Sequence, residues 1–235
     1  MNDKEKLLVS VIIPVFNEEL TVADIVDRVR KVLLKIGSKN EVIIVDDCSS
    51  DGSLEISRRL NAKVYALSKH MGKGYALKAG FAGAKGEIIA TIDSDGSHNP
   101  EELPRLQTPI LNDQADFVIG SRFLDQKPAA NKKFNELGVH LFNILIYILT
   151  NVGVTDSQSG YRVMKAAAVK GVSLKSGGYE IESEMLLKAA QKGFRVREVP
   201  ISFVQRTYGK SRLDPLADGF KILRSIFLGY LKVDE

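Results

Sequence analysis

Two carboxylates one residue apart, in Asp93-Ser94-Asp95, are the residues of this chain best suited to chemistry. They follow the apolar run 87–92, which has the pattern of a buried strand. Hard divalent cations take oxygen ligands, and Mg²⁺ in particular is held by one or two carboxylates together with substrate phosphates. The pair therefore predicts a metal-bridged diphosphate at the end of a strand. The alternative is an ordinary turn, since Asp, Ser and Gly also favour turns.

Polar residues also stand where the first two predicted strands end. In the segment Pro14–Glu18, Phe16 could stack on a nucleotide and Glu18 could hydrogen-bond it, unless the segment is a plain strand–helix junction capped by Asn17. After the second strand, Asp46-Asp47 and Asp51-Gly52 place three carboxylates around a turn. One of them could accept hydrogen bonds from a base or ribose, whereas Asp51 or Ser53 would cap the next helix.

Cations with flexible backbone follow other predicted strands. The segment Lys69–Gly74, which contains Lys73, precedes a predicted helix, and helix N-termini favour phosphate. Arg122 and the run Arg206–Arg212 add guanidinium groups, which bind phosphate in a planar, bidentate way. Each arginine taken alone fits a solvated surface at least as well, so both interpretations stay open for these residues.

Several other chemistries are disfavoured. The chain has no GxxxxGK[ST] phosphate loop, and no GxGxxG turn follows its first strand, which argues against a dinucleotide-dependent reductase. His70, His98 and His140 lack the spacing of metal ligands, and no Ser/His/Asp or Cys/His arrangement can be recognised. No aromatic-rich RNA-binding motif accompanies the basic residues, so nucleic acid is not an expected partner.

Strands and helices alternate between these polar groups. Because the predicted strands are continuously apolar, they favour an α/β fold with a parallel sheet covered by helices on both faces. Ligands of such sheets bind beyond the carboxyl ends of the strands, where the polar groups lie. The strands are predicted at 9–13, 41–45, 63–67, 87–92, 116–120 and 195–204, and the helices at 21–36, 53–60, 74–85, from 99 onward and at 179–192.

Composition sets the wider limits. The 235 residues, 44% of them hydrophobic, suffice for one large domain or a domain with an appendage. The single cysteine, Cys48, allows no internal disulfide and fits a reducing compartment, and the first residues lack the long apolar segment of a signal peptide. The net charge is +4, and basic residues gather toward the C-terminus, which favours phosphorylated ligands or an anionic membrane.

Two apolar segments mark the second half of the chain. The stretch 137–155 has no formal charge, and its part 141–149 is strongly apolar. Spanning a bilayer takes about 20 such residues, so the length is borderline, and His140, Asn143, Thr150 and Asn151 interrupt the stretch. We therefore expect a helix that packs in the domain or lies at an interface. The segment 215–231 predicts an amphipathic helix that packs on the core or contacts a membrane or partner. We divide the chain into a domain at 1–213 and a C-terminal contact segment at 214–235.

Together these residues resemble the family 2 inverting glycosyltransferases of the GT-A fold, and among them the soluble dolichyl-phosphate mannose synthase-like enzymes. The resemblance runs in family order from residue 9 to about residue 213. It implies a Rossmann-like, mostly parallel sheet flanked by helices, with C-terminal amphipathic helices. It rests on the segments 14–18, 46–52, 72–74, 93–98, 120–122, 156–162 and 206–212.

The resemblance also implies roles for single residues. Asp93 and Asp95 would hold Mg²⁺ or Mn²⁺ against the diphosphate, with Ser97 at the third ligand position. Asp95, Arg122 and Arg206 would be the catalytic residues. The nucleotide-sugar would contact Pro14, Phe16, Glu18, Asp47, Lys73, Asp93, Ser94, Asp95, Arg122, Arg206 and Arg212. The acceptor side would comprise Asp156, Ser159, Gly160 and Arg162, with Glu180 and Glu182 near the sugar.

The chain departs from the family pattern at several points. Phe16 stands where Tyr is usual, Ser97 where Gln is frequent, and Arg212 where Lys is usual. The C-terminal transmembrane helices of some relatives are missing. Attachment to the cytoplasmic face of a membrane would then need an amphipathic surface or a small membrane subunit.

The resemblance implies transfer of a sugar from a nucleotide-sugar, with GDP-mannose favoured and UDP-glucose nearly as suitable, to dolichyl or another polyprenyl phosphate. The expected mechanism is one in-line displacement, in which the metal and arginines neutralise the leaving diphosphate. A phosphate acceptor is already anionic and needs no strong base. The alternatives are transfer to a protein or polysaccharide hydroxyl, with Glu180 or Glu182 as base, and a non-catalytic nucleotide-sugar-binding subunit of a membrane complex.

Overall fold

A computed structural model describes residues 7–37, 39–124, 133–204, 206, 208 and 214–231, with side chains only from residue 138 onward in the helix that begins at residue 133. The predicted site residue Arg212 lies outside the described residues.

The described residues form a seven-stranded sheet in the order β3-β2-β1-β4-β6-β5-β7. Neighbouring strands are parallel except where β6 pairs antiparallel with both β4 and β5. The sheet therefore has the mostly parallel character that the sequence predicts. The strands are β1 (Val9–Val15), β2 (Asn40–Asp46), β3 (Lys63–Ala66), β4 (Ile88–Thr91), β5 (Phe117–Ser121), β6 (Arg162–Lys165) and β7 (Val196–Pro200).

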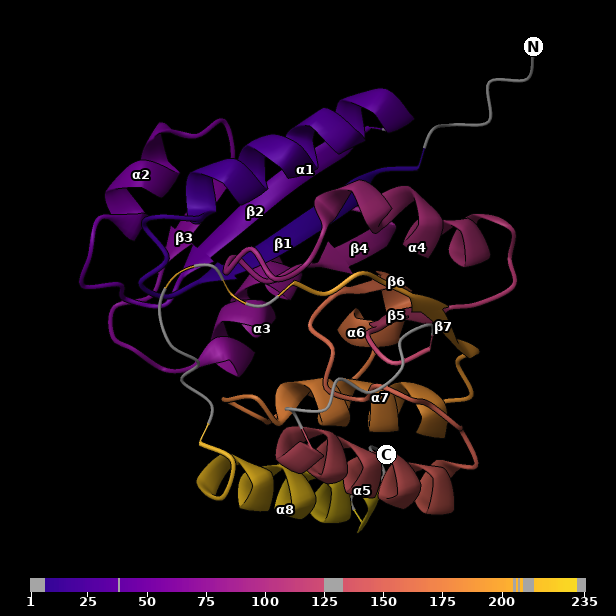
Figure 1. Ribbon diagram of the computed structural model, residues 1–235. Coiled ribbons are helices and arrows are strands. Elements are labelled where there is room, and N and C mark those ends of the chain that lie inside the picture. The colour runs from indigo at the N-terminus through magenta and orange to yellow at the C-terminus, as the bar shows by residue number, and fades with distance from the viewer. Residues whose placement is uncertain are drawn as a thin grey trace.

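Helices cover both faces of the sheet, as Figure 1 shows. One face carries α1 (Val22–Ile36), α2 (Ser53–Arg59) and α4 (Leu103–Leu111), the last preceded by the 3₁₀ turn η1 (Pro100–Glu102). The other face carries α3 (Lys73–Gly83), α6 (Ala167–Lys170) and α7 (Ile181–Gln191). An outer layer of α5 (Lys133–Thr150) and α8 (Ala217–Leu231) lies beyond α7.

The two cores explain the continuously apolar strands. Along β1, Val11 and Ile13 belong to the core under α1, whereas Ile12 belongs to the core under α3. All three are almost completely buried, so both sides of the strand lose contact with water. The helix α3 approaches β1 closely at Gly80, where a Cβ atom would stand 2.4 Å from Cγ2 of Ile12.

The sequence missed part of this architecture. The antiparallel strand β6 and the short helix α6 were not predicted, and the strand expected at 195–204 ends at Pro200. Beyond it, Phe203 forms an isolated antiparallel bridge with His98. Through this bridge, the segment after β7 lies beside the residues that follow β4.

The apolar segment 141–149 lies within α5 and packs in the domain, as expected. Phe142 and Ile146 join the same core as Ile222 and Ile226 of α8. Among the described residues, none of the helices combines the length and the apolar character that a bilayer crossing requires.

Candidate active site

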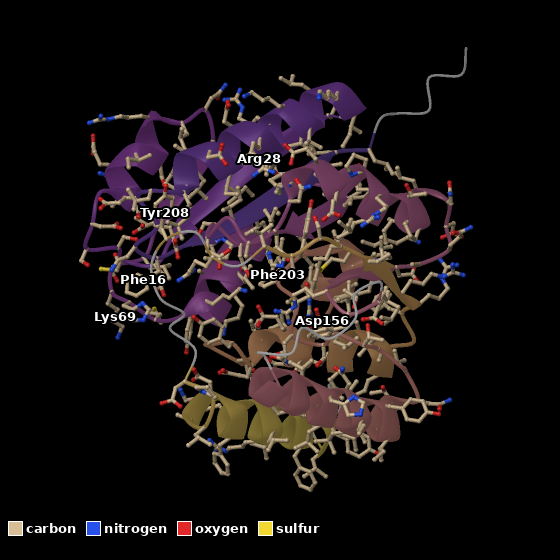
Figure 2. All side chains as sticks on the ribbon, viewed as in Figure 1. Phe16, Arg28, Lys69, Asp156, Phe203 and Tyr208 are labelled. Atoms are coloured by element: carbon tan, nitrogen blue, oxygen red, sulfur yellow. The ribbon has the colours of Figure 1, made fainter. Side chains whose placement is uncertain are left out.

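The carboxyl ends of the parallel strands bring the predicted polar groups to one edge of the sheet. Phe16, Asp47 and Arg122 directly follow β1, β2 and β5, and Asp93 follows β4 after Ile92. Because β6 runs antiparallel, it begins at this edge, and the segment 156–161 therefore reaches it too. Figure 2 shows Asp156 and Phe203 in the central part of the view, with Phe16 and Lys69 toward the side of β3.

Lys73 lies at the centre of this edge and joins two carboxylates. Its ammonium is 2.6 Å from Oδ1 of Asp93 and 2.7 Å from Oε1 of Glu182. All three are enclosed, with 16%, 24% and 3% of the respective side chains exposed. The structure therefore brings a predicted nucleotide-sugar residue, a predicted metal ligand and a predicted sugar contact into one cluster.

Burial and charge act against each other in this cluster. Burial alone would lower the pKa of Lys73, but the two carboxylates outweigh it and raise this pKa. Burial likewise opposes ionisation of Asp93, yet the charge of Lys73 lowers its pKa below the ordinary value. For Glu182 burial prevails and raises the pKa. Lys73 and Asp93 therefore both carry charge at neutral pH.

Glycines make room for this cluster. A Cβ atom at Gly160 would stand 2.5 Å from Oδ2 of Asp93 and 2.8 Å from Nζ of Lys73. At Gly72, whose φ is 104°, a Cβ atom would meet the carbonyl oxygen of Gly177 at 2.6 Å. Gly74 packs equally closely on the same segment and donates its N–H to that carbonyl. These positions require glycine because neighbouring backbone or charged groups fill the space of a side chain.

Asp95 has a second cation beside it. Nε of Arg206 lies 3.2 Å from Oδ2 of Asp95, and Nη2 lies 2.5 Å from Oε1 of Glu18. The Ser97 hydroxyl donates to Oδ1 of Asp95 at 2.6 Å, as does the Ser97 backbone N–H at 3.0 Å. Ser97 therefore orients Asp95, and its role as third metal ligand stays a prediction.

The donor set at this edge fits a divalent cation that also contacts phosphate. No cluster of three or more acidic, histidine or cysteine side chains suited to a metal occurs among the described residues. Asp93 and Asp95 offer two carboxylates, the usual protein contribution where substrate phosphates complete the shell of Mg²⁺. Both carboxylates are paired with cations, and Asp95 also accepts hydrogen bonds from Ser97, so the two groups are held in place.

Arg122 forms a bidentate pair with Asp156. Its Nε and Nη2 each lie 2.7 Å from a carboxylate oxygen of Asp156, which is completely buried. Burial opposes the charge on Arg122, but Asp156 raises its pKa. The guanidinium carbon also stands 5.2 Å from the centre of the Phe203 ring. Arg122 is thus a fixed, partly exposed cation at the edge of the sheet.

Arg162 is predicted on the acceptor side of the site. It is completely buried, and its guanidinium donates to the backbone carbonyls of Ser159, Glu182 and Ser157 at 2.7–2.8 Å. Burial lowers its pKa to about 10, so it remains charged at neutral pH. Arg162 therefore fixes the backbone at Ser157, Ser159 and Glu182, and its acceptor-side role stays a prediction. Ser159 is also completely buried.

Glu180 accepts hydrogen bonds from backbone groups just before α7. Its Oε1 accepts the N–H groups of Gly177 and Gly178, both at 3.1 Å. Ser94 is similarly engaged, because its hydroxyl donates to the carbonyl of Pro14 at 2.8 Å and ties the ends of β4 and β1 together. Direct contacts of these residues with substrate stay predictions.

Asp47 holds the loop after β3. Its two oxygens accept the N–H groups of Met71 and Gly72 at 2.8 and 2.7 Å, and Nδ1 of His70 lies 2.8 Å from Oδ2. The His70 ring stacks on Phe16. Asp47 and Phe16 are therefore brought together as predicted, but through a histidine to which the sequence assigns no role.

His98 and Phe203 are further residues of this edge to which the sequence assigned no role, although His98 belongs to the segment 93–98 that carries the family resemblance. His98 is almost completely buried between the rings of Tyr161 and Phe203, with Nδ1 3.8 Å from Oδ2 of Asp93. Burial lowers its pKa, so the ring stays neutral. The position of His98 three residues after Asp95 was the only available signal, and Phe203 had none.

Comparisons with known proteins agree with this geometry. The model of the family "Glycosyl transferase family 2" matches residues 10–172. A UDP-N-acetylglucosamine–dolichyl-phosphate N-acetylglucosaminyltransferase of Methanococcus voltae is 31% identical over 94% of this chain and 95% of its own length. A dolichol-phosphate mannosyltransferase of Pyrococcus furiosus is 32% identical over 93% of this chain and 62% of its own length.

An uncharacterized protein of Methanocaldococcus jannaschii is 34% identical over 97% of this chain and 94% of its own length. Among solved structures, glucosyl-3-phosphoglycerate synthase from Mycobacterium tuberculosis, in complex with Mn²⁺, UDP and phosphoglyceric acid, gives a TM-score of 0.76. The superposition covers 95% of this chain and 78% of the synthase chain, and the two sequences are 20% identical. This likeness establishes a shared GT-A fold.

Proposed function

The chain belongs to glycosyl transferase family 2, and on that premise we propose that it transfers a sugar from a nucleotide-sugar to dolichyl or another polyprenyl phosphate. The pairing of Asp93 with Lys73 and of Asp95 with Arg206 carries this proposal. Carboxylates that alternate with cations can serve a divalent metal and the phosphates of a donor at the same place. Mg²⁺ or Mn²⁺ would be held by Asp93 and Asp95.

The cations of the site would stabilise the leaving nucleoside diphosphate. A bound divalent metal would act as a Lewis acid on that diphosphate. Lys73, Arg122 and Arg206 would contribute fixed positive charge where negative charge develops, which is the most effective form of electrostatic stabilisation. Asp95, Arg122 and Arg206 are therefore our catalytic residues, and Glu182 would position Lys73.

An anionic acceptor suits a site whose two glutamates are each already engaged through one carboxylate oxygen. Within the described residues, Glu182 is paired with Lys73 and Glu180 accepts backbone N–H groups. A phosphate oxygen needs no deprotonation before it attacks the anomeric carbon. One displacement inverts that carbon, so an α-linked donor would give a β-linked lipid phosphate sugar.

The donor is the finer part of the proposal. By its name, the Methanococcus voltae relative transfers N-acetylglucosamine from UDP-N-acetylglucosamine to dolichyl phosphate. The Pyrococcus furiosus relative is named a dolichol-phosphate mannosyltransferase. We propose GDP-mannose as the first donor to test, followed by UDP-glucose and UDP-N-acetylglucosamine.

A lipid acceptor also explains the outer layer of helices. Ile148 of α5 and Phe220 of α8 are each 70% exposed, and Leu141, Tyr147 and Phe227 are more than half exposed. The described side chains of α5 carry no charge, and α8 adds the exposed cations Lys221 and Arg224. Apolar side chains with basic residues are typical of a surface that lies on anionic lipid. We propose that α5 and α8, the latter within the segment 214–235, rest on the cytoplasmic face of a membrane.

The activity is tested with labelled nucleotide-sugars, dolichyl phosphate and Mn²⁺. We expect label to pass into the organic phase with at least one donor and the product to be β-linked by NMR. Label that appears only on protein or polysaccharide would favour the hydroxyl acceptor. Metal-dependent donor binding without any turnover would favour a non-catalytic subunit.

The membrane face is tested by sedimentation with vesicles. Phe220→Asp should reduce binding to vesicles of phosphatidylcholine and phosphatidylglycerol by about fivefold or more. The substitution removes an apolar side chain that would enter the lipid surface and adds a negative charge that the anionic lipid repels. Leu34→Asp is the matched control, since Leu34 is 73% exposed on α1. Equal effects of the two variants would contradict the proposed orientation.

A further inference from the structure

His70 lies on Phe16 in the manner of a stacked base. The two ring centroids are 3.9 Å apart and the planes differ by only 12°. His70 comes from the loop after β3, whereas Phe16 comes from the loop after β1. More than half of the His70 side chain, 55%, is exposed to solvent. An exposed imidazole thus covers an aromatic ring at the edge where the proposed function places the nucleoside.

His70 also presents a donor to a buried carboxylate. Its Nδ1 lies 2.8 Å from Oδ2 of Asp47, whose side chain is only 3% exposed. An ionised carboxylate can only accept hydrogen bonds, so the imidazole donates this proton. The remaining partners of Asp47 are the backbone N–H groups of Met71 and Gly72.

These two contacts are the ones that a nucleobase would make. Every base offers a flat ring for stacking, and some bases also offer a ring N–H for a carboxylate. The backbone of the loop would stay fixed by Met71 and Gly72 if the imidazole rotated away, because those two bonds do not involve the His70 side chain. Oδ2 of Asp47 would then regain an acceptor position in a buried setting, where an unmet hydrogen bond is costly.

We propose that the His70 side chain stands in the position of the donor's nucleobase, and that base binding displaces it from Phe16 and Asp47. The base that takes its place presents a ring N–H to Asp47. Uracil and guanine have such a group on their Watson–Crick edge, whereas adenine and cytosine present an unprotonated ring nitrogen there, which a carboxylate repels. This inference rests on the proposed function and adds that His70 competes with the base and that Asp47 selects its class.

The displacement can be followed directly by NMR, because the chain has three histidines. The ring protons of His70 are assigned by comparison with His70→Ala and should carry a ring-current shift from Phe16. Addition of UDP with Mg²⁺ should remove that shift, whereas pyrophosphate with Mg²⁺, which has no base, should leave it.

Affinity gives the second measurement. In calorimetry, His70→Ala should bind UDP about three- to tenfold more tightly than the unaltered chain. This factor corresponds to the free energy of one aromatic stack, the contact between His70 and Phe16 that UDP no longer has to break. Pyrophosphate affinity should not change, and ADP and CDP should bind at least tenfold more weakly than UDP or GDP. His140→Ala is the control, since His140 is exposed on α5 in the outer layer.

The outcomes separate the two levels of the proposal. If UDP binds while the His70 resonances keep their position, or if His70→Ala weakens UDP binding, the displacement is wrong and the proposed function stands. If ADP and CDP bind as tightly as UDP and GDP, the selection by Asp47 is wrong. If neither UDP nor GDP binds either protein, the proposed function falls and this inference with it.

Discussion

Two clusters of ion pairs stand at opposite edges of the sheet. At the carboxyl edge Lys73 bridges Asp93 and Glu182. At the amino edge Asp116, just before β5, is paired with Lys165 of β6 at 2.7 Å and with Arg195, just before β7, at 2.9 Å. Both clusters join segments that are far apart in the sequence, and both contain short contacts.

They differ in enclosure and in what surrounds them. Glu182 and Lys73 are 3% and 16% exposed, whereas Lys165 and Arg195 are 37% and 47% exposed. The amino-edge pairs are therefore largely solvated and fasten the ends of three strands, a modest contribution to stability. The carboxyl-edge pairs lie among glycines and loop ends, where charge is held ready for a ligand. Location at the carboxyl edge and enclosure, and not the presence of ion pairs, therefore distinguish the proposed site.

The largest expected effect is the loss of transfer in Asp95→Ala. The rate should fall on the order of 10³-fold, because a ligand for the metal and its electrostatic contribution disappear. The midpoint of thermal unfolding should change little, since Asp95 lies in a loop. Initial rates and circular dichroism melts measure the two effects. The control is Asp113→Ala, because Asp113 is an exposed member of the amino-edge cluster that pairs with Lys165 and Arg195, and its rate should stay within about twofold. Equal losses in both variants would erase the functional difference between the clusters.

Gly160→Ala should lower the rate by about 10–100-fold. Its added methyl group would stand 2.5 Å from Oδ2 of Asp93 and would push this carboxylate or Lys73 aside. A misplacement of about 1 Å at reacting groups can cost 100-fold. Gly153→Ala is the control, because its nearest atom would be 3.9 Å away. Steady-state rates test the pair, and full activity of Gly160→Ala would show that this packing is not critical.

Glu182→Gln should reduce the rate by about tenfold. Lys73 would lose one partner but keep Asp93, so its position would loosen without the charge being lost. If the acceptor were a hydroxyl and Glu182 its base, the loss should reach 10²–10⁴-fold while donor affinity is retained. Rate and donor affinity measured together decide between these mechanisms, with Glu55→Gln on the exposed face of α2 as control.

The smallest effect belongs to the amino edge. Hydrogen bonds from Arg195, with Lys165, hold the pKa of Asp116 well below its usual range despite partial burial. A lowered folded-state pKa gives stability that is present above the ordinary pKa near 4 and is lost as the pH falls below it. Asp116→Asn should therefore cost about 1 kcal/mol at pH 7, and less at pH 3. Urea melts at both pH values test this, and an unchanged rate is expected throughout.

Much of the fold follows from local patterns. Runs such as Val42–Val45 are apolar on both faces, which only a sheet covered on both sides explains. β6 was missed because it has four residues, Arg162–Lys165, and two of them are charged at its ends. Its place between β4 and β5 is decided by non-local pairing that no local pattern encodes.

The meeting of Asp93, Asp95 and Lys73 at one edge of the sheet was predictable, because each follows a predicted strand, whereas their roles stay predictions. The sequence could not predict which side chains form hydrogen bonds with backbone groups instead of facing the open edge of the sheet. Arg162 has the same chemistry as Arg122 in sequence, but it is buried under three carbonyl groups. Likewise the partner of Phe16 is His70, 54 positions along the chain, and that stack exists only because the loop after β3 is anchored on Asp47.

The reversed direction of β6 also bears on synthesis. β1 to β4 pair among themselves and can assemble while the ribosome still holds the rest of the chain. The second edge of β4, however, stays unpaired until β6 has been synthesised. Asp95 likewise gains its contact with Arg206 only later, because Arg206 lies 111 positions further along the chain. The nascent protein can therefore form the β1–β4 part of its sheet early, but the proposed site is completed only after residue 206 has emerged.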